Sequence, residues 1–254
     1  MTSSKAARAR SRRERAGEEQ ATRERERRRR LMQFGSGAGF LAICAVAVLI
    51  VLSQSQSGGD ADNIEGIAEV NRLLAGLDQR GSLLGDPSAA ARIVEYGDLQ
   101  CPICKEYSTG VIEDLIAGPV SAGDARLQFR TWAVLGSQSV DAARAALAAG
   151  RQGRLWSFIE LFYRNQGIEQ TGYVTDEFLT AIARGAGVRD LARWNRERRS
   201  DRFDPELNSV ASQATALGFT GTPSFAVLGT GGTAVPGTVP TLDSIESALR
   251  EVGG

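Results

Sequence analysis

Hydrophobic and polar positions divide the chain into a polar leader, one long apolar run and a patterned region that reaches the C-terminus. In that region, apolar residues at helical spacing predict a helix from Ile64 to Leu77. Apolar and alternating runs predict strands at Arg92–Tyr96 and Leu127–Trp132, with a helix running through Val111–Ile116 between them. The order is therefore strand, helix, strand, which is typical of an α/β fold.

The segment from about 138 to 203 shows only helical patterns and is predicted to be a helical insertion. Helices are predicted at Ser139–Ala149, at Arg154–Asn165 and from the cap residue Thr175 to Gly185. The arginines between 184 and 202 alternate with acidic residues. This alternation favours a solvated face over a substrate-binding patch.

The C-terminal part returns to a mixed pattern. A helix is expected to start at Asp204-Pro205 and to end before Gly218. Strands are predicted at Ser224–Leu228 and Thr233–Val235, joined by a glycine turn, and a last helix, capped by Thr241, at Leu242–Val252. The predicted order is βαβ, helical insertion, αββα.

Charge is distributed unevenly although the net charge is zero. Residues 1–30 contain 12 Lys/Arg against 5 Asp/Glu. Residues 34–52 carry no charge, and as a helix they would extend about 28 Å, close to the thickness of the hydrocarbon core. The positive-inside rule keeps the basic side in the cytoplasm. We therefore predict a cytoplasmic tail (1–33), a transmembrane signal anchor (34–52), a linker (53–62) and an extracytoplasmic domain (63–254).

The N-terminal region admits two further interpretations. Small residues at 53–57 would permit a cleavable signal peptide, but the long leader and the length of the apolar run favour an uncleaved anchor. The arginine run could bind nucleic acid. Its interleaved glutamates and its place before the apolar run favour a solvated, orienting tail, so we expect no nucleic-acid partner.

The candidate chemistry is a pair of cysteines, Cys101 and Cys104, where the first predicted strand passes into a helix. Cysteines three residues apart on a helical turn lie on one face and can form or open a disulfide. Cys101 would occupy the helix N-cap, where unpaired backbone N–H groups and the helix dipole favour a thiolate. Pro102 falls at the first helical position, which proline tolerates well.

A lone C-x-x-C pair can also occur in sites that exchange no electrons. A structural zinc site needs four ligands, and this chain has no histidine and only Cys44 besides the pair, so we expect no metal and no cofactor. A static structural disulfide remains open, because an extracytoplasmic location permits one. Two unpaired core thiols are the third alternative.

The residues around the pair resemble a known group. Glu95-Tyr96-Gly97-Asp98-Leu99-Gln100 precedes the cysteines, and Gly221-Thr222-Pro223-Ser224-Phe225 follows the helical insertion. This combination is similar to the DsbA-like thiol-disulfide oxidoreductases of the thioredoxin superfamily, in their membrane-anchored form. The resemblance runs from about Leu73 to Val252 and implies a thioredoxin-like fold with an inserted helical subdomain, preceded by one transmembrane helix.

The resemblance also implies roles for individual residues. Pro223 is expected in the cis form, facing the cysteines, with Thr222 offering backbone hydrogen bonds to a substrate strand. Glu95 matches the family's buried acid beneath the second cysteine, and desolvation would raise its pKa, so that it could exchange a proton with Cys104. Asp98 is expected only to shape the turn into the helix.

The dipeptide between the cysteines departs from the strongest oxidants of the family, which have a histidine where this chain has Ile103. A helix dipole alone would bring the pKa of Cys101 to about 7. A less stabilised thiolate makes a less oxidising disulfide, so extreme oxidising strength is not expected. Pro102, Ile103, Thr222 and Pro223 are assigned to substrate binding.

The function implied is an extracytoplasmic oxidase that introduces disulfides into exported proteins through Cys101 and Cys104. The resemblance implies that thiol-containing exported proteins are its substrates and that a quinone-linked membrane partner reoxidises it. Two alternatives remain: a reductase or isomerase that uses the same pair, and a non-enzymatic thioredoxin-like binding module. Isomerases of this type carry a sizeable dimerisation module, for which residues 60–90 are too short.

Overall fold

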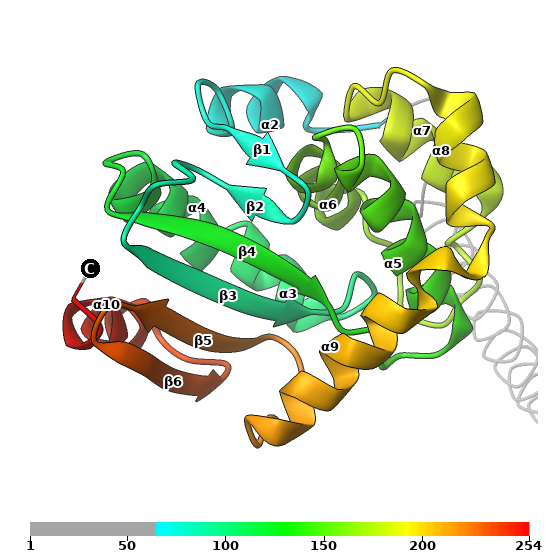
Figure 1. The fold of residues 1–254 in the computed structure, drawn as a ribbon. Helices are drawn as coiled ribbons and strands as arrows, with labels where there is room; N and C mark the ends of the chain where they lie inside the picture. Colours follow the sequence, from blue (N-terminus) through cyan, green and yellow to red (C-terminus); the bar gives the residue numbers. More distant parts are fainter. Residues whose placement is uncertain (1–63, 254) are drawn as a thin grey trace, which may run out of the picture. The chain divides into compact units, whose positions relative to one another are not determined.

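The computed structural model describes residues 64–253. Within this range the strands form one six-stranded sheet in the order β1-β2-β4-β3-β5-β6 (Figure 1). Strands β3 (Ala91–Gly97) and β4 (Ala125–Thr131) are parallel, and every other pairing is antiparallel. This is the mixed α/β sheet that the sequence predicts, with β3 at its centre.

The elements from β3 onward follow the predicted order. The remaining strands are β1 (Gln79–Arg80), β2 (Leu83–Leu84), β5 (Ser224–Gly229) and β6 (Gly232–Thr238). The helices before and after β4 are α2 (Ile67–Leu73), α3 (Pro102–Ser108), α4 (Val111–Leu115), the π-helical turn η1 (Ile116–Val120), α5 (Ser137–Gly150), α6 (Leu155–Arg164), α7 (Asp176–Gly185), α8 (Leu191–Arg198), the 3₁₀ turn η2 (Asp201–Phe203), α9 (Asp204–Ala216) and α10 (Leu242–Glu251).

The central strand β3 is buried on both faces, and its side chains alternate between two separate cores. One face of β3 contributes Ile93 to a large core that the helices of the insertion share. The other face contributes Val94 and Tyr96 to a smaller core with Val210 and Ala214 of α9. Helix α9 accordingly crosses the sheet on the opposite side from α3 and α6 (Figure 1).

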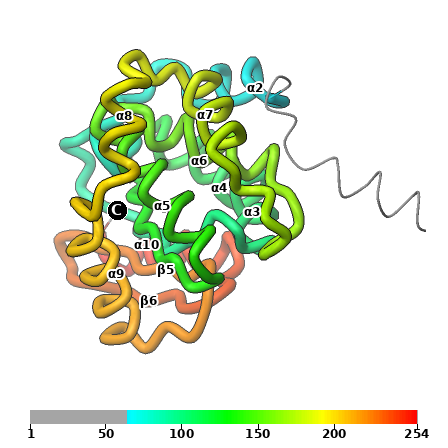
Figure 2. The backbone as a smooth tube through the Cα atoms, turned by 90° about the vertical axis from the view of Figure 1, so that its right-hand side faces the viewer, coloured from blue at the N-terminus to red at the C-terminus, as the bar shows by residue number. Residues whose placement is uncertain are grey.

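Helices α5 to α8 form the insertion between β4 and α9, and they gather at one end of the molecule (Figure 2). Thr175 caps α7 by accepting a hydrogen bond from the Phe178 N–H, as the sequence predicts. Trp156 and Trp194 are fully buried, and their indole N–H groups donate to the backbone oxygens of Ser82 and Ala145. The insertion is therefore packed into the same core as the sheet.

Three expectations need correction, and one hairpin is not predicted. The first helix ends at Leu73, not at Leu77. The hairpin β1–β2 that follows it is missed because strands of two residues leave no alternating pattern. The helix that starts after Cys101 does not continue unbroken to Ile116, since it breaks at Thr109-Gly110 and resumes as α4. The arginine-rich face is only partly solvated: Arg198 and Glu197 are buried, and both form ion pairs.

No helix within residues 64–253 has the length and apolar character to cross a bilayer. The predicted span at 34–52, and Cys44 within it, lie outside the described residues.

Candidate active site

The cysteine pair lies on the first turn of α3, directly beyond the carboxyl end of the central strand β3. Cys101 is the N-cap, and its Sγ accepts a hydrogen bond from the Cys104 N–H at 3.4 Å. Both cysteines are free thiols. Both sulfur-bearing residues are buried, Cys104 fully and Cys101 at 6% exposure, so Cys101 is the less buried of the two but is not an exposed residue.

The Thr222-Pro223 segment lies next to Cys101 in the fold, although it is 121 positions away in the sequence. The Thr222-Pro223 peptide bond is cis, which confirms that expectation. The carbonyl oxygen of Thr222 lies 3.4 Å from the Sγ of Cys101 and accepts a hydrogen bond from the thiol. The predicted site residues at 101–104 and at 222–223 are thus brought together by the pairing of β3 with β5.

The environment of Cys101 favours its thiolate. Its pKa falls from 9 to about 6, mainly because the Cys104 thiol is hydrogen-bonded to its sulfur. Thr222 and the backbone N–H groups of Cys104 and Ile103 lower the pKa further, against the opposing effect of burial. This value is lower than the 7 expected from the helix dipole alone, because these local hydrogen bonds add to the dipole.

Cys104 and Glu95 have the opposite character. Burial raises the pKa of the Cys104 thiol well above 9, and the neighbouring Cys101 and Glu95 raise it further. Glu95 lies on β3 at 2% exposure, and burial raises its pKa well above the usual value, as do the nearby Glu160 and Cys101. Its Oε1 has no hydrogen-bond partner. Burial therefore disfavours the charged forms of both Glu95 and Cys104, and Glu95 is close enough to affect the ionisation of Cys104.

Asp98 has a larger role than the turn residue that the sequence suggests. It is 1% exposed, and its carboxylate accepts four hydrogen bonds. The donors are the N–H groups of Gln100, Val134 and Leu135 and the hydroxyl of Ser139, at 2.7–2.9 Å. One side chain thus joins the loop before the cysteines to the connection from β4 to α5.

Two glutamines hold the same loop against the insertion. Gln166 donates to the carbonyl oxygens of Leu99 and Cys101, at 2.7 Å and 3.1 Å. Gln100 donates to Ser139 and accepts from the N–H of Gln170. The segment after α6 thereby fixes the backbone next to the reactive cysteine. Spacing along the chain carries no signal for these contacts, which span 39 to 70 positions.

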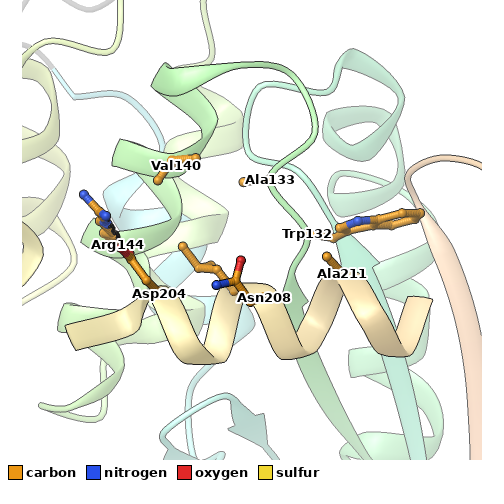
Figure 3. Close-up of a pocket in the computed structure, with 8 residues that line it drawn as sticks. Trp132, Ala133, Val140, Arg144, Asp204, Asn208 and Ala211 are labelled. Carbon is orange, nitrogen blue, oxygen red and sulfur yellow. Dashed lines mark hydrogen bonds and ion pairs between the residues drawn. The ribbon is translucent and has the colours of Figure 1, made fainter. Parts of the chain in front are cut away.

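A cavity of about 280 Å³ lies next to this network, on the far side of the connection from β4 to α5. It is lined by Trp132 and Ala133 from that connection, by Val140 and Arg144 of α5, and by residues of α9 (Figure 3). Arg144 donates to Asp204 through Nε and Nη2 and joins α5 to α9. Neither cysteine lines this cavity, so it is separate from the dithiol.

The sheet order, the dithiol at the start of α3 and the cis proline facing it define a DsbA-like protein of the thioredoxin superfamily. The family model described as thioredoxin matches residues 78–235, and the chain belongs to that family.

The chain is similar to curated proteins and, in its fold, to a solved structure. The probable disulfide bond formation protein D of Bacillus cereus is 26% identical over 149 residues, which cover 58% of this chain and 69% of the relative. The Na(+)/H(+) antiporter NhaA 1 of Mycolicibacterium gilvum is 32% identical over 165 residues, covering 62% of this chain but only 25% of the antiporter. Oxidised BdbD from Bacillus subtilis shares the fold, with a TM-score of 0.61 at 20% identity, over 68% of this chain and 94% of that one.

The pKa of Cys101 makes the stability of the reduced protein depend on pH. A thiol whose pKa falls from 9 to about 6 on folding stabilises the folded state fully above pH 9, and this stabilisation is lost as the pH falls through 6. We expect the reduced protein to gain about 2 kcal/mol over the oxidised protein between pH 6 and pH 8. Urea denaturation of both redox forms measures this difference, and a difference independent of pH would contradict it. Reduced Cys101→Ser protein, which lacks the titrating thiol, is the control.

Asp98→Ala would leave three backbone N–H groups without an acceptor, one of them buried and two partly buried. We expect it to lower the free energy of unfolding by about 3 kcal/mol, the low end of roughly 1–3 kcal/mol for each unpaired group, because two of the three groups are only partly buried. Asp98→Asn keeps one carbonyl oxygen and should cost less. Urea denaturation measures both variants, with the exposed Asp243→Ala as a control that should stay within about 0.5 kcal/mol of the wild type. A loss below about 1 kcal/mol for Asp98→Ala would contradict the role of this side chain.

Proposed function

We propose that this protein is an extracytoplasmic thiol-disulfide oxidoreductase that introduces disulfides into exported proteins through Cys101 and Cys104. The observation that supports this most directly is the unequal state of the two thiols. Cys101 has a pKa of about 6 beside Thr222-Pro223, while the pKa of the fully buried Cys104 is raised. The Bacillus cereus relative, named a probable disulfide bond formation protein, supports the same activity.

The reaction follows from this inequality. With the pair oxidised, a substrate thiolate attacks the Sγ of Cys101, the disulfide breaks, and its electron pair goes to the Sγ of Cys104. Cys104, whose pKa is raised, takes up a proton from Glu95. A second substrate thiolate then attacks the mixed disulfide, and Cys101 leaves as a stabilised thiolate. The substrate gains a disulfide, and the protein retains the two electrons.

Exposed apolar side chains around the cysteines suit an unfolded or extended substrate. Ile103 is 43% exposed, and Ile168, Val134 and Val239 are also exposed. Each lies on a segment that contacts the site: Ile168 follows Gln166, Val134 donates to Asp98, and Val239 donates to the Pro223 oxygen. Pro102 is exposed beside Ile103. With Thr222 and Pro223, these residues form the surface that we assign to substrate binding.

The location and partners belong to the same proposal. A basic tail at 1–33, an uncleaved anchor at 34–52 and a linker at 53–62 would hold the domain at 63–254, with its insertion at about 138–203, outside the cytoplasm. Thiol-containing exported proteins are then the substrates. A quinone-linked membrane protein would accept the two electrons and restore the disulfide.

Electron flow in the other direction, as a reductase or isomerase, is the alternative that the thiol pair itself permits. At pH 7 a thiol with a pKa of about 6 instead of 9 stabilises the reduced form by about 1.4 kcal/mol, which makes the pair about 30 mV more oxidising. This modest effect favours the oxidase direction without extreme oxidising strength.

The reduction potential distinguishes the two directions. We expect equilibration of the full-length protein with a glutathione series to give a potential above about −240 mV, because the thiolate of Cys101 favours the reduced state by about 30 mV. A value near about −270 mV, typical of thioredoxin, would indicate a reductase instead.

Cys104→Ala separates a redox enzyme from a non-enzymatic binding module. The probe is a cysteine peptide whose sulfur is joined in a disulfide to thionitrobenzoate. In this variant the Cys101 thiolate should attack the peptide sulfur and release thionitrobenzoate. The peptide should then stay attached to Cys101 as a mixed disulfide. In the wild type Cys104 should resolve the adduct and release the peptide thiol. Mass spectrometry measures the adduct. Cys101→Ala is the matched control without an adduct, and the absence of an adduct on Cys104→Ala would refute the enzymatic proposal.

A further inference from the structure

A second buried carboxyl, Glu160 of α6, lies on the same side of the sheet as Glu95. The side chain of Glu160 is 1% exposed. Trp156, one helical turn before it, packs edge to face against Phe129, with ring centroids 6.2 Å apart. Phe129 is the register partner of Glu95 on the neighbouring strand. Helix α6 therefore presents Glu160 toward the space beneath Glu95, and residues i and i+4 of a helix share a face.

The active-site helix completes this cluster. Cys104 and Ser108 lie one turn apart on the buried face of α3 and are both buried. Helix α3 packs against α6, and Ser108 is close enough to Glu160 to affect the pKa of its carboxyl. The Ser108 hydroxyl and the Glu95 Oε1 are both buried without a hydrogen-bond partner. The two carboxyls and the Cys104 thiol thus share one enclosed polar region.

The two carboxyls differ in their partners. Arg164 donates to the Oε2 of Glu160 at 2.6 Å, and the same guanidinium donates to Glu113 of α4 at 2.6 Å. Glu95 forms no ion pair in the part of the chain that the structure describes. A negative charge is therefore supported on Glu160 but not on Glu95.

The ionisable groups facing Glu95 are all acids. They come from α3 (Cys101, Cys104 and Tyr107) and from α6 (Glu160 and Tyr163). Burial raises the pKa of Glu160 only to about 7, because Arg164 opposes the effect, and Glu113 adds a small increase. Burial, Glu160 and Cys101 raise the pKa of Glu95 well above its usual value.

We propose that Glu160 is a positioning residue for the dithiol chemistry: its charge, held by Arg164, keeps the proton on Glu95 until the Cys104 sulfur departs. The inference rests on the proposed function, since it assigns a proton to one step of that reaction. When the disulfide breaks, its electron pair goes to the Sγ of Cys104 and the proton moves from Glu95 to that sulfur. Glu95 is left as a carboxylate beside the charged Glu160, and this repulsion favours its reprotonation from solvent.

Glu160→Gln tests the proposal in the full-length protein. The rate of disulfide reduction by dithiothreitol, corrected for the thiolate fraction of the reagent, should fall at high pH as Glu95 loses its proton. In Glu160→Gln the midpoint of this fall should move about one pH unit lower, because one repelling charge is gone. Glu160→Asp keeps the charge and should retain the wild-type midpoint. Glu106→Gln removes the same charge from an exposed position of α3 and should also retain it.

A double-variant cycle locates the effect. Glu95→Gln should abolish the fall, and Glu160→Gln should then change nothing further in that background. An unchanged midpoint in Glu160→Gln, or a shift that persists without Glu95, would overturn the proposal. A disulfide that dithiothreitol does not reduce at any pH would instead refute the proposed function, so the two failures are distinct.

Carboxyl titration of the wild-type protein by ¹³C NMR keeps the test valid if Glu160→Gln fails to fold. Two coupled titrations are expected, with Glu160 ionising before Glu95. Independent titration of both groups near pH 4.5, the value of an ordinary glutamate, would also overturn the proposal.

Discussion

The buried carboxylate of Asp98 is the interaction on which the rest of the site depends. Three backbone N–H groups and one hydroxyl converge on it from two separate segments of the chain. Tyr163 of α6 also donates to the Asp98 backbone oxygen. The end of β3, the start of the insertion and α6 are thus joined around a single residue. Because Cys101 is three positions further on, its sulfur is placed by the same set of bonds.

One turn of helix gives two identical thiols different chemistry. Cys101 at the N-cap receives hydrogen bonds that stabilise a thiolate, whereas Cys104 faces the core and neighbouring acids that disfavour one. The difference arises from position and not from residue type. The insertion contributes to both environments, through Gln166 at the Cys101 carbonyl and through Glu160 near Glu95. It is therefore part of the reactive centre as well as part of the core.

Whereas the cis form of Pro223 is implied only by the family resemblance, the central strands and the cysteine pair could be predicted because each depends on local pattern or on residues adjacent in the sequence. Thr175 marked the start of α7 for the same reason. Asp98 and Glu160 could not be predicted, since their roles depend on partners from other elements: Asp98 needs Val134 and Ser139, and Glu160 acts on Glu95 of β3. The break at Gly110 could not be predicted either, because apolar spacing continues across it while the backbone does not.

The sequence has no histidine, the side chain that usually changes charge near neutral pH. Among residues 64–253, Cys101 has a pKa of about 6 and Glu160 a pKa of about 7, and both raise the pKa of the buried Glu95. At the proposed location outside the cytoplasm, where acidity varies with the surroundings, mild acidification would act chiefly on the neighbourhood of the sulfurs. Both the electron-transfer properties and the stability of the reduced protein would therefore respond to pH.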